Sequence, residues 1–123
     1  MSTPTLSALF FYVRDLDRTA AFYGDVLGFH VERAEGHDGA YLIASAGEDQ
    51  PAFVFYPADE PPGRSPVVVF GLEGGIEEAV AALVRHNVEI VTPVSEAPDG
   101  GLTADFLDPD GHVLSYYQPV EQA

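Results

Sequence analysis

Apolar side chains recur along the chain at two spacings, one typical of strands and the other of helices. Residues 6–13 are apolar and β-prone and lie between Pro4 and Asp15, which predicts a strand. Gly28 is placed where a helix commonly ends on a left-handed residue. The apolar residues in between recur at spacings of four, three and four, which predicts one helix face: Leu16, Ala20, Tyr23 and Leu27.

The same order of elements then returns. Three strands are predicted after the helix: 29–34, 39–45 and 52–57. The Pro- and acid-rich stretch 58–65 has no apolar period and predicts a linker. A strand, a helix with the same four, three, four spacing and three more strands follow: 67–72, 76–87, 89–94, 101–107 and 113–118.

Equivalent positions in the two halves are separated by a nearly constant offset. Tyr23 and Leu83 are 60 residues apart, and Phe29 and Val88 are 59 apart. The pattern predicts an α+β fold of two βαβββ modules in tandem, within a single domain 1–123. Module 1 covers about 5–57, the linker 58–65 and module 2 about 66–119. A four-stranded sheet with one helix leaves one face uncovered, so we expect the modules to pair around a crevice that can hold a ligand.

The charge balance excludes several classes of partner. The chain has 20 acidic residues against five basic residues, no Cys and a net charge of −15. Nucleic acids and anionic membranes attract basic surfaces, so neither is expected as a partner. All five bases are Arg, which excludes lysine Schiff-base chemistry, and such a Lys-free composition is typical of a GC-rich bacterial genome. No signal peptide or apolar membrane span is recognisable, so a cytoplasmic location is expected.

Two motifs carry a family resemblance. Residues 12–29, Tyr-Val-Arg-Asp-Leu-Asp-Arg-Thr-Ala-Ala-Phe-Tyr-Gly-Asp-Val-Leu-Gly-Phe, resemble the first strand–helix signature of the vicinal-oxygen-chelate superfamily. Residues 106–114, Phe-Leu-Asp-Pro-Asp-Gly-His-Val-Leu, resemble its Asp-Pro-Asp-Gly hairpin. That superfamily includes glyoxalase I, extradiol dioxygenases and bleomycin-resistance proteins, so the resemblance implies the fold and a homodimer but leaves the chemistry open. The Asp-Pro-Asp-Gly stretch itself suits a tight turn with Asp side chains on its backbone amides.

The resemblance also implies where a metal would be held. Metal-dependent members use His, Gln or Glu from the first and fourth strands of each repeat, and the matched positions here are Ala8, Phe53, Val67 and Ser115. Three of these side chains cannot ligate a metal and a neutral Ser is a poor ligand, so neither a metal nor another cofactor is expected. The four histidines are scattered over separate elements: His30, His37, His86 and His112.

Strand alternation, started from Ala8, assigns the crevice lining. The predicted ligand-binding residues are mostly aromatic or apolar: Phe10, Tyr12, Phe53, Phe55, Val67, Val69, Thr103, Asp105, Ser115 and Tyr117. Such a lining suits a flat, apolar organic molecule. The alternatives are that these aromatic residues fill the crevice as core, and that Asp105 is solvated at the rim.

The sequence therefore predicts metal-free binding or sequestration of a small aromatic or cationic molecule, of the bleomycin-resistance type found among antibiotic-resistance proteins. An acidic surface would steer a cationic ligand toward the site. The alternative is a lyase, isomerase or dioxygenase of the same superfamily, which would need an unanticipated metal or an acid–base residue such as Asp105. A third interpretation is an interaction subunit with a filled crevice.

Overall fold

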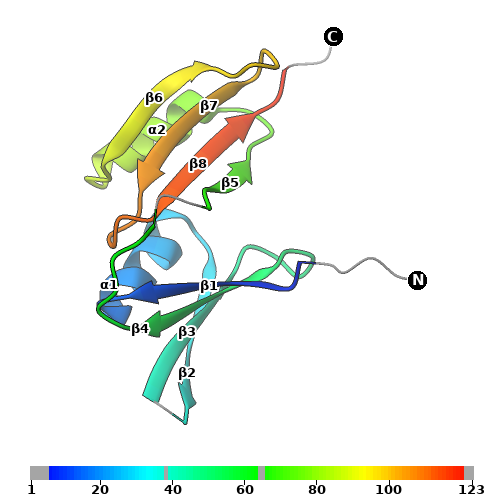
Figure 1. Cartoon of the computed structure of the whole chain (residues 1–123). Coiled ribbons are helices and arrows are strands. Elements are labelled where there is room, and N and C mark those ends of the chain that lie inside the picture. Colours follow the sequence, from blue (N-terminus) through cyan, green and yellow to red (C-terminus); the bar gives the residue numbers. More distant parts are fainter. Residues whose placement is uncertain (1–5, 38, 64–65, 121–123) are drawn as a thin grey trace. The chain divides into compact units, whose positions relative to one another are not determined.

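The computed structural model describes residues 6–37, 39–63 and 66–120. The chain divides into two compact units, residues 1–60 and 61–123, and each is described by itself. Each unit contains a four-stranded sheet with a helical segment between its first two strands, which confirms the predicted α+β fold of two βαβββ modules (Figure 1). Within the described part of the chain, no helix has the length and apolar character needed to cross a membrane.

The first unit is built on a mixed sheet. Its strand order is β1-β4-β3-β2, and β1 lies parallel to β4 while the other neighbours are antiparallel. Figure 1 shows β1 in blue beside β4 in green. The elements follow in this order: β1 (Ala8–Val13), α1 (Leu16–Ala20), the π-helical segment η1 (Ala21–Val26), β2 (His30–Gly36), β3 (Gly39–Ser45) and β4 (Ala52–Pro57).

An aromatic cluster holds the helical segment of the first unit to one face of its sheet. Tyr23 of η1 is completely buried, and its ring centroid lies 4.6 Å from that of Phe55. Phe53 and Phe29 make further ring contacts with Tyr23. Other apolar side chains complete this core: Val13, Leu16, Phe22, Leu42 and Ala44.

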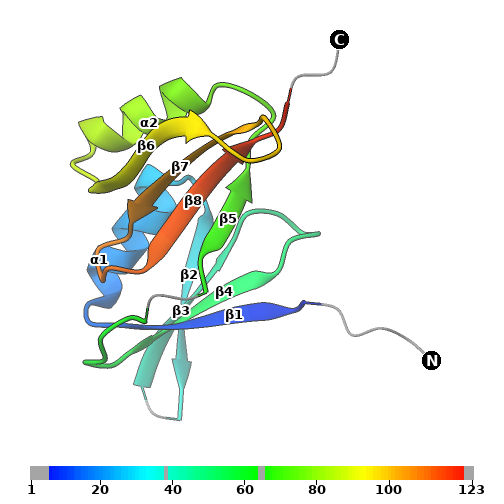
Figure 2. The ribbon, with the colours of Figure 1, turned by 45° about the horizontal axis from the view of Figure 1, so that its top comes forward.

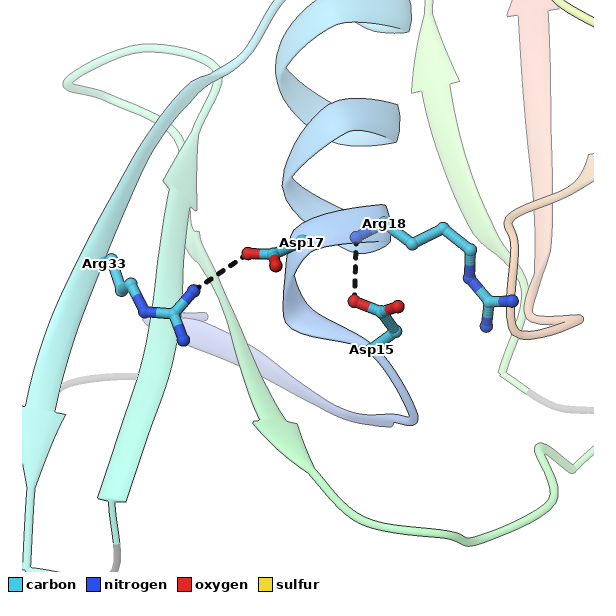
Figure 3. Close-up of polar contacts among 4 residues, drawn as sticks. All are labelled: Asp15, Asp17, Arg18 and Arg33. Carbon is cyan, nitrogen blue, oxygen red and sulfur yellow. Dashed lines mark hydrogen bonds and ion pairs between the residues drawn. The ribbon is translucent and has the colours of Figure 1, made fainter.

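The helix of the first unit differs from the continuous α-helix that the spacing predicts. Asp15 caps its start, since Oδ1 accepts a hydrogen bond of 3.2 Å from the backbone N–H of Arg18 (Figure 3). After α1 the chain continues as the wider η1, where the Leu27 N–H donates to the Phe22 carbonyl five residues back. Gly28 then adopts a φ of 82°, which confirms the predicted left-handed end.

One exposed ion pair links α1 to the edge strand β2. An Arg33 guanidinium nitrogen lies 3.1 Å from Asp17 Oδ1, and Figure 3 shows the two side chains pointing toward each other. The Asp17 side chain is 91% exposed, so this pair contributes at most about 1 kcal/mol. The contact matters here because it places Arg33 on the helix-covered face of the sheet.

The second unit repeats this plan with a regular helix. Its strand order is β5-β8-β7-β6, and β5 lies parallel to β8. The helix α2 runs across one face of this sheet (Figure 2). The elements are β5 (Val68–Gly71), α2 (Ile76–Arg85), β6 (Ile90–Glu96), β7 (Leu102–Leu107) and β8 (Val113–Gln118). The core lies between helix and sheet and includes Ile76, Leu83, Ala104, Phe106 and Leu114.

The start of α2 is capped by a side chain from the last strand. Gly75, at the N-cap position, has no side chain that could accept a hydrogen bond from the helix. Gln118 supplies the missing acceptor, because its Oε1 accepts a hydrogen bond of 2.9 Å from the Ile76 N–H. The cap therefore ties the first turn of α2 to the end of β8.

The Asp-Pro-Asp-Gly stretch forms the predicted turn before β8. Asp108 is buried, and its Oδ1 accepts hydrogen bonds of 2.9 Å from the backbone N–H groups of Asp110 and His112. Gly111 adopts a φ of 93°, which a residue with a side chain rarely adopts. The prediction that an Asp side chain caps the amides of this turn is confirmed.

Candidate functional site: an aromatic sheet face

The uncovered face of the first unit's sheet is defined by its register. Phe10 pairs with Val54 and Val54 with Ile43, and Ile43 pairs in turn with Glu32. Paired residues on neighbouring strands point to the same face of a sheet. These four side chains therefore form one row across all four strands, on the face opposite α1 and η1.

A second row on this face is aromatic. Tyr12 pairs with Tyr56, and the next strand contributes Tyr41, whose ring centroid lies 5.2 Å from that of Tyr56. Phe10 of the first row stacks on Tyr56 with ring centroids 5.7 Å apart. We call Phe10, Tyr12, Tyr41 and Tyr56 the aromatic face.

The aromatic face is accessible. Phe10 is 64% exposed, Tyr12 55% and Tyr56 37%. Large aromatic side chains are usually buried, and contiguous exposed apolar surface marks binding sites more often than chance. The prediction that Phe10 and Tyr12 lie on the uncovered face is therefore confirmed for the orientation of their side chains.

The predicted orientation of Phe53 and Phe55 is wrong. Phe53 is only 6% exposed and Phe55 is completely buried, and both rings contact Tyr23 on the helix side. The parallel pairing of Ala8 with Ala52 turns the odd-numbered residues of β4 toward the helix. A shift of one residue exchanges the two faces of a strand, so Val54 and Tyr56 point to the face opposite the helix, where Val54 is 8% exposed and Tyr56 37%.

Sequence reasoning also missed Tyr41, Tyr56 and Glu32. A signal for Tyr56 was present in β4, where Phe53 and Phe55 alternate with Val54 and Tyr56. A phenol hydroxyl needs a polar environment, so the set that contains Tyr suits the exposed face better than the set with two Phe rings.

The predicted residues of the second unit share one face as expected. Val69 pairs with Ser115, and Ser115 with Asp105. Thr103 pairs with Tyr117 in the next row. Val67 precedes β5 and is 43% exposed. This face lies opposite α2, since the alternate residues Phe106 and Leu114 are buried in the core.

Most polar groups on this second face bond within the chain. Ser115 Oγ lies 3.2 Å from Thr103 Oγ1 and 3.1 Å from the Ala104 carbonyl oxygen, to which it donates. Thr103 Oγ1 donates in turn to the Tyr116 carbonyl oxygen at 3.1 Å. Asp105 is half-buried at the centre of this face.

Tyr117 is bound to the loop between β6 and β7. Its hydroxyl donates a hydrogen bond to Asp99 Oδ2, while Asp99 Oδ1 accepts one of 2.9 Å from the Gly101 N–H. The bond from Tyr117, followed by that from Gly101, lowers the pKa of the Asp99 carboxyl. The same bond to Asp99 raises the pKa of the Tyr117 phenol. The geometry therefore gives Tyr117 a structural partner of its own.

The residues at the family's metal positions do not fit a divalent ion. Ala8, Val67 and Phe53 have no donor atom in their side chains, and the Phe53 ring lies in the core. Ser115 Oγ already bonds within the sheet. Nor do three or more His, Asp or Glu side chains converge elsewhere among residues 6–37, 39–63 and 66–120.

The first unit also has a surface hollow on its helix side. The hollow has a volume of about 530 Å³ and lies between the helical segment and β2. Ala20, Ala21 and Gly24 leave this space open above Val31 and Leu42. One aromatic residue, the half-buried Phe29, lines the hollow, against four on the opposite face, so we take the aromatic face as the candidate binding site.

The two repeated βαβββ units define the class of fold, and comparisons with known proteins supply the family. The model of the Glyoxalase/Bleomycin resistance protein/Dioxygenase superfamily matches residues 5–116. The chain belongs to this superfamily. A search of curated proteins found no significant match.

Solved structures show the same fold. TnmS3, an antibiotic binding protein from Streptomyces sp. CB03234, is 23% identical, with a TM-score of 0.81 over 98% of this chain and 99% of that one. A superfamily enzyme from Burkholderia phytofirmans is 17% identical, with a TM-score of 0.81 and coverage of 95% and 100%. Lactoylglutathione lyase from Agrobacterium tumefaciens is 16% identical, with a TM-score of 0.72 and coverage of 96% for each chain.

Proposed function

We propose that this protein binds a small aromatic or cationic organic molecule without a metal and without modifying it, as bleomycin-resistance-type proteins do. The observation that carries the proposal is the aromatic face, in which Phe10, Tyr12 and Tyr56 are exposed and Tyr41 is half-buried. Its stacked rings offer a flat apolar surface to a flat ligand.

Three further observations support this function. The net charge of −15 attracts cations over long range. The side chains at the family's metal positions offer no ligand set, so chemistry that depends on those ligands is not expected. A structure with the same fold is that of an antibiotic binding protein.

The test is a titration of the purified protein with two cationic aromatic probes, bleomycin and 9-aminoacridine. Calorimetry measures the heat of binding, and Tyr emission reports on the aromatic face, since the chain has six Tyr and no Trp. We expect saturable binding of at least one probe. Flat heats and unchanged Tyr emission for both probes would refute the proposal.

Two variants locate the site. Tyr56→Ala removes the ring that contacts both Phe10 and Tyr41 and should weaken probe binding about tenfold, as expected for the loss of one stacking partner. Val84→Ala is the control, because Val84 is 56% exposed but lies on α2 of the other unit. Equal losses in the two variants would place the site elsewhere.

The same experiments distinguish the enzymatic alternative. Conversion of a probe, or a stoichiometric divalent ion in protein purified without chelator, would support a superfamily enzyme instead of a binding protein. We also propose that the protein is a homodimer, as the family resemblance implies, and sedimentation at micromolar concentration tests this.

A further inference from the structure

We infer that Glu32 is the cation-recognising group of the aromatic face, and that the site therefore prefers planar aromatic cations over neutral or anionic aromatic molecules. This inference rests on the proposed function and names the ligand class of the same site. Sequence reasoning had included Asp105 of the second unit among the ligand-binding residues, with a solvated position as the alternative, and had not identified Glu32.

The register places Glu32 on the same face as the aromatic rings, at the β2 edge of the sheet. Glu32 pairs with Ile43. Tyr41, two residues before Ile43, shares its face of β3 and pairs with Ala34. Tyr41 is thus a diagonal cross-strand neighbour of Glu32, and such neighbours lie about 7–8 Å apart. The Tyr41 ring leans the other way along the sheet, toward Gly36, where its Cε1 would lie 3.2 Å from an added Cβ. A ligand stacked on Tyr41 and Tyr56 must therefore extend over Ile43 to bring its charge to the Glu32 carboxylate.

The charges of this sheet are divided between its two faces. All charged and titratable side chains of the four strands, apart from the Tyr phenols, belong to β2: His30, Glu32, Arg33 and Glu35. Alternation puts His30 and Glu32 on the uncovered face, and His30 Nε2 lies 3.1 Å from Glu32 Oε1. Arg33 points the other way, to Asp17 of α1.

The uncovered face of these strands therefore carries one carboxylate and no Arg or Lys. The Glu32 side chain is 67% exposed, so a ligand can approach it. A planar cation would stack on Tyr41 and Tyr56 and gain both a cation–π interaction with the rings and attraction to Glu32. An anion would gain neither, which is the physical basis of the expected preference.

The long-range attraction of a chain with charge −15 must be separated from this local effect. Glu35 offers a matched control, because it lies on the same strand three residues further on and points to the opposite face. Glu32→Gln and Glu35→Gln remove the same charge from the same strand. They change the net charge equally, so only the local interaction differs between them.

The experiment measures the affinity of both variants and the wild type for two probes at low salt, near pH 8. The probes are 9-aminoacridine, which is a cation at that pH, and acridine, which is neutral and of similar shape. We expect Glu32→Gln to weaken binding of 9-aminoacridine about three- to fivefold, the upper part of the range for an exposed ion pair, and to leave acridine within twofold. Glu35→Gln should leave both affinities within twofold, and the effect of Glu32→Gln should shrink at high salt.

The outcomes separate this inference from the proposed function. If neither probe binds the wild type, both the proposed function and this inference are overturned. If both probes bind but Glu32→Gln and Glu35→Gln behave alike, the binding function stands and the role of Glu32 is overturned. If Tyr56→Ala abolishes a dimer seen by sedimentation and no probe binds, the aromatic face is a contact between copies of the chain and the inference fails.

Discussion

Phe55 and Tyr56 are consecutive residues of β4 whose side chains point to opposite faces of the sheet, so truncating each one tests the face assignment directly. Phe55 is completely buried and its ring packs 4.6 Å from Tyr23 and 5.5 Å from Phe11, between centroids. Replacing a buried Phe by Ala typically costs about 3–5 kcal/mol of unfolding free energy. Tyr56→Ala leaves the core intact and loses two ring contacts on an exposed face, which corresponds to about 1–2 kcal/mol.

The two variants should therefore differ by about 2 kcal/mol in unfolding free energy. Urea unfolding followed by far-ultraviolet circular dichroism measures this difference. With a slope of about 1–3 kcal/mol per molar urea, the midpoint of Phe55→Ala should lie about 1 M below that of Tyr56→Ala. Binding should show the reverse order, because only Tyr56 belongs to the aromatic face.

The reverse stability order would refute the assignment of these two faces. It would mean that the odd-numbered residues of β4 are exposed, as sequence reasoning had them, and that the register with β1 is shifted by one residue. Phe55→Leu keeps the comparison measurable if Phe55→Ala does not fold. Its midpoint should still fall below that of Tyr56→Leu, while probe affinity should fall only in Tyr56→Leu.

Three further predictions concern the second unit. Gly101→Ala should lower stability by about 1–3 kcal/mol in urea unfolding, because an added Cβ would lie 2.6 Å from the Gln118 carbonyl oxygen, and an unchanged midpoint would contradict this close approach. Gln118→Ala should lower the unfolding free energy by about 1 kcal/mol and speed amide exchange at the start of α2, because the Ile76 N–H loses its acceptor. Gln118→Glu keeps an acceptor and should lower the unfolding free energy less. Tyr117→Phe should be less stable than wild type near neutral pH. Tyr117 lowers the pKa of Asp99, so its contribution is present above the unfolded Asp pKa of about 3.9 and is lost as pH falls through the lower folded value. A stability difference that stays constant from pH 7 to pH 2 would argue against the Asp99 bond as its source.

The order of elements was predictable because it depends on local periodicity repeated twice. The strands Gly39–Ser45, Ala52–Pro57 and Val113–Gln118 have the predicted bounds. The π-helical segment Ala21–Val26 was not predicted, because spacings of four, three and four are satisfied by an α-helix and contain no sign of a wider turn.

The faces of β1, β5, β7 and β8 were predicted correctly, whereas the faces of β4 were not. In β1 the starting point was Ala8, the position matched to the family's first-strand ligand, and alternation from it gave the observed orientation of Phe10 and Tyr12. In β4, the orientation depends on hydrogen-bonded register with β1, which joins residues 44 positions apart through a pairing such as Ala8 with Ala52. A position counted from one repeat to the other carries an error of one residue, and one residue is enough to exchange the faces.

Under the proposed function, recognition rests on the chemistry of a sheet face and not on a metal, since the side chains at the family's metal positions supply no ligand set. The two repeats share a topology but differ in what their uncovered faces can offer. Thr103, Ser115 and Tyr117 already bond within the second unit, so a ligand there would have to break or share existing hydrogen bonds. In the first unit three of the four aromatic rings are exposed, and Glu32 alone contributes a carboxylate to that face of the strands. The overall acidity thus sets the sign of the long-range field, while the proposed local preference depends on one carboxylate at the β2 edge of the face that carries the four rings.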